Sequence, residues 1–176
     1  MDYAIILGFD KKTEDKFRDI TEAIADSGVN RYMLDNKIPP HVTISCVCTE
    51  DVAPVIAALD RYCAKLKPGE LFWPSLGSFA PSVLFAAPVL NEYLMNACIG
   101  VNKLVKKYAE IGDSGHYLPY QWVPHTTLAY KLNEAELKKA FEVAVQHFSA
   151  FGGKTNRLIL AQCNPYKKLQ TWEFAN

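Results

Sequence analysis

Two histidines of this sequence are each followed, two positions later, by a threonine. The two segments read PHVTI over residues 40–44 and PHTTL over residues 124–128. Because strand side chains alternate between faces, His41 and Thr43 would share one face of a strand, and His125 and Thr127 would share another. An imidazole beside a hydroxyl is suited to proton transfer and to hydrogen bonding of an anionic oxygen.

Both segments together would suit the chemistry of a phosphodiester if they met in one cleft. A neutral imidazole takes a proton from water or a hydroxyl group, and a protonated imidazole gives one to the leaving oxygen. The hydroxyls of Thr43 and Thr127 would bind the phosphoryl oxygens, where negative charge grows. This scheme requires no metal, and the four histidines lack metal-ligand spacing, so we expect neither a metal nor another cofactor.

One such segment alone is weak evidence, because a structural histidine beside a strand-forming threonine gives the same letters. The two copies lie 84 positions apart, about half of the chain, which makes the pair far more specific. The other histidines have no threonine partner. His147 falls late in a predicted helix, where a cation suits the helix dipole. His116 falls in a loop before the second segment and could contact a substrate.

The elements predicted around these segments alternate between strands and helices. We expect strands over residues 3–9, 41–48, 70–78, 82–87, 122–130, 156–163 and 168–174. We expect helices from a cap at Thr13 to Gly28, over residues 50–66 and 89–110, and from a capping box at Asn133 and Glu136 to about residue 148.

The order strand, helix, strand, strand after His41 recurs after His125, which indicates an internal repeat. We therefore predict an α+β fold with antiparallel-rich sheets, outer helices and a pseudo-twofold repeat. Residues 1–176 would form one domain with two similar lobes around a central cleft, each lobe carrying one H-x-T segment.

The paired H-x-T segments resemble the signature of the two-histidine (2H) phosphoesterase superfamily, which includes bacterial RNA 2′,5′-ligase-like proteins and cyclic nucleotide phosphodiesterases. The resemblance covers nearly the whole chain, since residues 76–79, 83–85 and 169–174 resemble further strands of that family. It implies two α+β lobes around a cleft and metal-independent action on 2′,3′-cyclic phosphates or 2′,5′ linkages. It also implies His41 and His125 as catalytic residues and two phosphate-binding hydroxyls, on Thr43 and Thr127.

Composition limits the ligand and the setting. The 176 residues include 19 Lys and Arg and 19 Asp and Glu, so net charge is zero, and 49% are hydrophobic. This excludes a disordered chain and a broad nucleic-acid coat, and it allows a small anionic ligand. Among the substrates that the resemblance implies, neutral net charge favours a nucleotide or RNA end over a long duplex. We see no signal peptide and no apolar run of the ~18 residues that would span a membrane. The five cysteines show no metal-like spacing, and we expect reduced thiols in a cytoplasmic monomer.

Three aromatic residues near these segments are candidates for stacking on a base: Tyr120, Trp122 and Tyr166. Ordinary packing is the competing interpretation of each. The competing function is a non-catalytic module that binds a nucleotide or RNA end in the same cleft. An acyl-transfer hydrolase built on Ser114 is a third, much weaker hypothesis, because no triad order surrounds it. The sequence leaves open which histidine is base or acid, and whether hydrolysis or ligation occurs.

Overall fold

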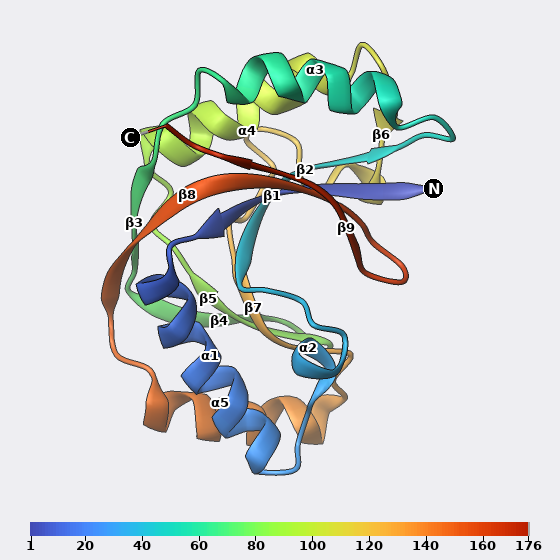
Figure 1. The fold of residues 1–176 in the computed structure, drawn as a ribbon. Coiled ribbons are helices and arrows are strands. Elements are labelled where there is room, and N and C mark those ends of the chain that lie inside the picture. The colour runs from blue at the N-terminus through green and yellow to red at the C-terminus, as the bar shows by residue number, and fades with distance from the viewer. Residues whose placement is uncertain (176) are drawn as a thin grey trace.

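Two antiparallel sheets divide the strands of the computed structural model, which describes residues 1–175 (Figure 1). The larger, curled sheet has the order β3-β8-β1-β2-β6, with β9 also paired to β8, and the smaller has the order β4-β5-β7. The strands are β1 (Asp2–Phe9), β2 (His41–Cys48), β3 (Gly69–Trp73), β4 (Ser75–Phe79), β5 (Val83–Ala87), β6 (Glu110–Ile111), β7 (Thr126–Tyr130), β8 (Phe151–Gln162) and β9 (Lys167–Glu173). The predicted α+β class with antiparallel sheets is confirmed.

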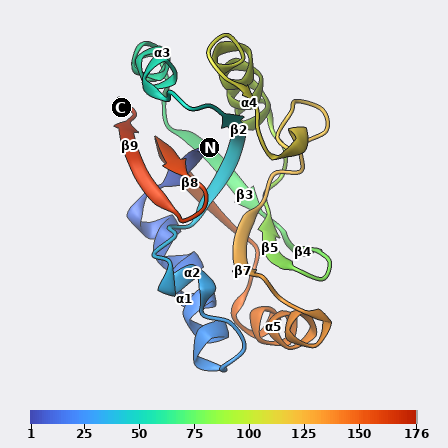
Figure 2. The same cartoon turned by 90° about the vertical axis from the view of Figure 1, so that its right-hand side faces the viewer.

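Helices cover the two sheets at opposite ends of the molecule (Figure 2). They are α1 (Lys11–Asp26), α2 (Tyr32–Asp35), α3 (Ala53–Cys63), α4 (Glu92–Val105) and α5 (Glu134–His147), with a 3-10 turn η1 (Asp113–Gly115). Helices α3 and α4 pack near the larger sheet, whereas α1 and α5 pack together against the smaller one. No helix among residues 1–175 has both the length and the apolar character to span a bilayer.

The chain repeats one order of elements. Apart from α2, β6 and η1, the order β1-α1-β2-α3-β3-β4 is followed by β5-α4-β7-α5-β8. The long strand β8 corresponds to β3 and β4 together, and β9 has no counterpart. The Asp10 side chain caps α1 by accepting a hydrogen bond from the backbone N–H three residues later. Asn91, 81 positions after Asp10, caps α4 in the same way. Strand β1 pairs with β2 as β5 pairs with β7. Strands β3 and β8 pair with Leu71 opposite Gly153, 82 positions later, so a pseudo-twofold axis passes between these two residues.

Several predicted boundaries shift in the structure. The cap of α1 is Asp10, not Thr13, because the buried Thr13 hydroxyl instead accepts from the Lys154 backbone N–H at 3.0 Å. The predicted strand over 70–78 is broken at Pro74, which offers no N–H to a ladder, and its halves join different sheets. The predicted strand over 122–130 begins only at Thr126, and α3 and α4 are shorter than expected. The capping box of Asn133 and Glu136 is confirmed.

An aromatic cluster in the core fixes the second H-x-T segment. Trp73 is fully buried, with ring centroids 5.2 Å from Phe9, 5.0 Å from Phe17 and 5.3 Å from Phe151. Its indole Nε1–H donates to the buried hydroxyl of Thr126 at 3.2 Å. This bond ties β3 to the residue that follows His125, so the core holds the start of β7 in place.

Thr126→Val should therefore destabilise the protein by about 1–3 kcal/mol, because the Trp73 N–H would lose its acceptor in a dry core. Chemical denaturation measures the change in the free energy of unfolding. The matched control is Thr127→Val, one residue on, whose side chain is partly exposed. If the control costs as much as Thr126→Val, the buried hydrogen bond does not carry the effect.

Candidate active site

His41 is the first residue of β2, and its ring orientation is fixed by the backbone just before it. The ring Nδ1 lies 2.7 Å from the carbonyl oxygen of Pro39. Because a carbonyl can only accept, Nδ1 carries the hydrogen, which leaves Nε2 as the atom that exchanges a proton. Val42 and Ile44 are fully buried on the core side. The predicted alternation of this strand thus orients His41 and Thr43 away from those two residues.

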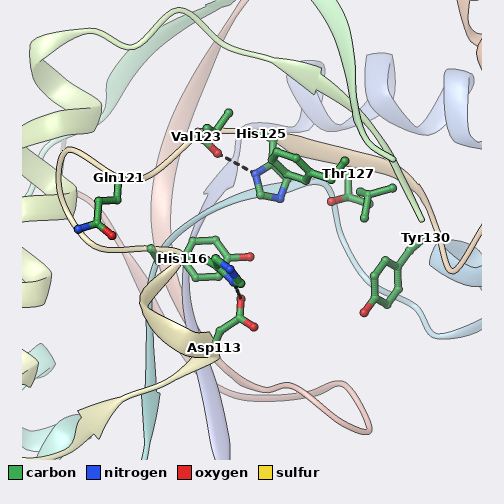
Figure 3. Close-up of a pocket in the computed structure, with 10 residues that line it drawn as sticks. Asp113, His116, Gln121, Val123, His125, Thr127 and Tyr130 are labelled. Carbon is green, nitrogen blue, oxygen red and sulfur yellow. Dashed lines mark hydrogen bonds and ion pairs between the residues drawn. The ribbon is translucent and has the colours of Figure 1, made fainter. Parts of the chain in front are cut away.

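His125 repeats this arrangement immediately before β7. Its Nδ1 donates to the carbonyl oxygen of Val123 at 2.9 Å, again two residues upstream, so Nε2 is free here as well (Figure 3). Thr127 lines the same cavity as His125. The alternate residues Thr126 and Leu128 are buried. Both H-x-T segments therefore present an imidazole and a hydroxyl in the same local geometry.

Two adjoining cavities contain the four predicted side chains. One, of about 520 Å³, is lined by His125 and Thr127, and the other, of about 240 Å³, by His41 and Thr43. The walls of both include Asp113, Tyr117 and Tyr130. Strands β2 and β7 lie close together although they belong to different sheets. We call the two cavities together the cleft, and it brings the two predicted segments into one site.

Tyr117 links the two segments. Its ring stacks beside the His125 ring, with centroids 6.3 Å apart and planes at 26°. Burial raises the pKa of its phenol, an effect that the side chain of Thr43 opposes. The sequence predicts a loop here but does not single out Tyr117, because a tyrosine in a loop carries no spacing signal.

Further aromatic rings surround His125 on the side of the smaller sheet. Phe79 meets the imidazole edge-to-face, with centroids 4.9 Å apart at 90°, and the Phe85 centroid lies at 5.3 Å. These rings come from β4 and β5, and Phe79 also lines the larger cavity. Their contribution was not predicted, because the sequence alone does not distinguish an apolar strand residue that faces the core from one that faces the cleft. The larger cavity thus has an apolar wall next to a proton-transfer group.

Burial makes both imidazoles weak bases. It lowers the pKa of His41 to about 4, an effect that the Pro39 carbonyl opposes and the nearby His125 reinforces. Burial also lowers the pKa of His125, and there both the Val123 carbonyl and the Asp113 carboxylate oppose it. Both rings are therefore neutral at pH 7 without a ligand. An anion bound between them would favour their protonated forms.

Asp113 occupies a strained position at the mouth of the cleft. Its φ is 46°, and that of Ser114 is 51°, in the left-handed region that non-glycine residues rarely occupy. The Asp113 carboxylate lies 3.7 Å from Nδ1 of the exposed His116, which also lines the larger cavity. Strain of this kind persists where surrounding structure imposes it, often at functional sites. Asp113 was not predicted as a site residue.

The three predicted stacking residues lie in different surroundings. Tyr166 lines the smaller cavity with His41 and Thr43. Tyr120 is 82% exposed and lines a separate cavity beside α4. Trp122 is only 5% exposed, belongs to the hydrophobic core and lines neither cavity of the cleft. The structure therefore brings only Tyr166 together with the H-x-T segments. His147 is exposed in the last turn of α5.

No group of three or more His, Cys, Asp or Glu residues that could hold a metal ion occurs in the part of the chain that the structure describes.

Comparison with known proteins identifies the fold. Neither a protein-family model nor a curated protein matches this sequence. Solved structures match nearly the whole chain. TT0787 of Thermus thermophilus has a TM-score of 0.65 and 14% identity, covering 99% of this chain and 98% of that one. A phosphoesterase has a TM-score of 0.57 and 11% identity, covering 99% of both chains. Escherichia coli LigT complexed with 3′-AMP has a TM-score of 0.54 and 12% identity, covering 99% and 98%.

Titration of the ligand-free protein should show His41 with a midpoint near pH 4 rather than at the ordinary histidine pKa of 6.5. NMR signals of the imidazole C–H groups measure this, and His41→Gln assigns the resonance. Because the folded-state pKa is the lower one, the unfolded chain takes up protons first as the pH falls from 6.5 to 4. The wild type should thus lose more folding stability than His41→Gln over that window. A midpoint at or above 6.5 would contradict the burial of this ring.

Proposed function

We propose that this chain is a phosphoesterase in which His41 and His125 transfer protons while Thr43 and Thr127 hold the phosphoryl group. One observation carries the proposal. In each H-x-T segment, a backbone carbonyl two residues upstream fixes Nδ1, so that each Nε2 is left to exchange a proton beside a hydroxyl. The fold that the chain shares with a phosphoesterase adds support.

The substrate class that best fits the cleft is a nucleotide or RNA end with a 2′,3′-cyclic phosphate or a 2′,5′ linkage. The larger cavity, about 520 Å³, has room for a nucleoside, and the exposed Phe79 ring offers a stacking surface in its wall. Escherichia coli LigT, which has the same fold, is complexed with a nucleoside monophosphate, 3′-AMP.

The proposed reaction needs only proton transfers and one displacement at phosphorus. A neutral imidazole removes a proton from water, and the oxygen forms a bond to phosphorus. The bond from phosphorus to one ribose oxygen breaks, and that oxygen takes a proton from the imidazolium of the other histidine. Hydroxyls of Thr43 and Thr127 donate to the non-bridging oxygens as negative charge grows on them. The product is a phosphomonoester, and a 5′-hydroxyl of RNA in place of water would form a 2′,5′ linkage.

We assign the base role to His41 and the acid role to His125. The Asp113 carboxylate acts on His125 and favours its protonated form, whereas the neighbouring His125 disfavours protonation of His41. The bound phosphate supplies the negative charge that lets His125 carry its proton near neutral pH. Two imidazoles in similar local geometry thus have different electrostatic surroundings, which is the condition for distinct acid and base roles.

Replacement of either histidine tests the proposal. His41→Ala and His125→Ala should each lower kcat/KM toward nucleoside 2′,3′-cyclic phosphates by about 100-fold or more, because each removes one proton-transfer group. Turnover is measured in EDTA, and we expect the wild type to remain active there. His147→Ala is the matched control, since this exposed histidine lies on α5. Turnover that survives both cleft substitutions would refute the proposal, and nucleotide binding without turnover would favour a binding module.

The pH dependence tests the assigned roles. The profile of kcat/KM should be bell-shaped with a maximum below pH 6.5, because it reports the free enzyme, in which both histidine pKa values are lowered. Asp113→Asn removes the charge that raises the pKa of His125, so the high-pH limb should move to lower pH. The low-pH limb, set by His41, should stay in place. A shift of the low-pH limb alone would reverse the two roles.

A further inference from the structure

A third cavity lies between the two H-x-T segments. Its volume is about 240 Å³, and its walls include Pro39 and Pro40, directly before His41, together with Thr127. Thr127 also lines the larger cavity of the cleft, so the two cavities meet at this residue. Thr127, whose hydroxyl is proposed to bind phosphate, thus lines both the cleft and this third cavity.

The third cavity supplies positive charge that the cleft lacks. Among the described residues that line the two cavities of the cleft there is no lysine or arginine, and the carboxylates there are Asp2 and Asp113. Arg18 of α1 and Lys37 line the third cavity. An anion bound near Thr127 therefore finds lysine and arginine side chains only on the side of the third cavity.

Nearby carboxylates do not cancel this charge. Glu14, which also lines the cavity, is ion-paired with Arg157. Asp15 is shared between Lys11 and Arg18, with 3.3 Å to the Arg18 guanidinium. In these ion pairs two carboxylates face three cations, and Lys37 adds a further cation to the cavity.

The internal repeat has no cation at the two equivalent positions, although Lys103 and Lys106 line the separate cavity beside α4. At the offset of 81 that relates the capped helices, Arg18 corresponds to Ile99 of α4. At the offset of 84 that relates the two histidines, Lys37 corresponds to Gln121. Both counterparts are uncharged. The fold alone does not require cations at these positions, since the second half of the chain forms the same elements without them.

We infer that the third cavity is a second phosphate site, in which Arg18 and Lys37 bind a phosphate that neighbours the one at Thr127. Guanidinium and ammonium groups both bind phosphate oxygens through charge-assisted hydrogen bonds. The inference rests on the proposed function and narrows its substrate class. The preferred substrate carries a further phosphate beside the reacting one, as the end of an RNA strand does, and a lone nucleoside cyclic phosphate lacks that group.

The test compares two substrates that differ by one phosphate: adenosine 2′,3′-cyclic phosphate and its 5′-phosphorylated form. The wild type should have the higher kcat/KM for the 5′-phosphorylated form. In the double variant Arg18→Gln/Lys37→Gln, this preference should fall by about tenfold, since charged hydrogen bonds are lost. Lys12→Gln removes an exposed charge of the same helix outside the cavity and should keep the preference. Equal rates of the wild type on both substrates, or an unchanged preference in the double variant, would overturn the second site.

A binding measurement separates failure of the second site from failure of the proposed function. Calorimetry compares adenosine 3′,5′-bisphosphate with 3′-AMP, which lacks the second phosphate. Tighter binding of the bisphosphate by the wild type, lost in the double variant, supports the second site even if no cyclic phosphate is hydrolysed. Equal affinities, or no binding of either nucleotide, would overturn it.

Discussion

The pairing of β3 with β8 is the interaction on which the cleft depends. It places Leu71 opposite Gly153 and joins the two halves of the chain about their pseudo-twofold axis. Continuous with this pairing, β8 runs on to pair with β1, while the break at Pro74 sends β4 into the smaller sheet. The backbone is close-packed here, because a side chain at Gly153 would collide with Thr13 of α1. The two sheets, and with them the two histidines, are positioned by this contact.

The same packing that orients the imidazoles also removes their charge. Burial favours the neutral form of both rings, and His125 further disfavours protonation of His41. A proton donor is therefore disfavoured in the empty cleft and favoured once an anion is present. In the proposed mechanism the negative charge of the substrate completes the acid–base pair, and an uncharged molecule of the same shape would lack this effect. The proposed selectivity for phosphate would thus follow from electrostatics as well as from hydrogen bonds donated by Thr43 and Thr127.

Short-range patterns were predicted well, and long-range choices were not. The bounds of β2 and the capping box at Asn133 follow from spacing that involves only neighbouring residues. At α1, both Asp10 and Thr13 are residue types that cap helices. The choice between them depends on Lys154, 141 positions away, whose backbone N–H donates to the Thr13 hydroxyl. Tyr117 likewise reaches the site through a loop whose course is set by tertiary contacts, such as the bond from Asn102 to its carbonyl oxygen.

Strand β9 has no counterpart in the repeat, and its connection to β8 contributes Asn164 and Tyr166 to the cavity of His41 only. In a dimer of two identical chains related by a true twofold axis, both imidazoles would have the same surroundings. Joining the halves in one polypeptide removes this symmetry constraint, because each half can then have neighbouring residues that the other lacks. The two ends of the cleft accordingly differ in the residues that line them. An asymmetric ligand would therefore fit the cleft in one orientation better than in the reverse.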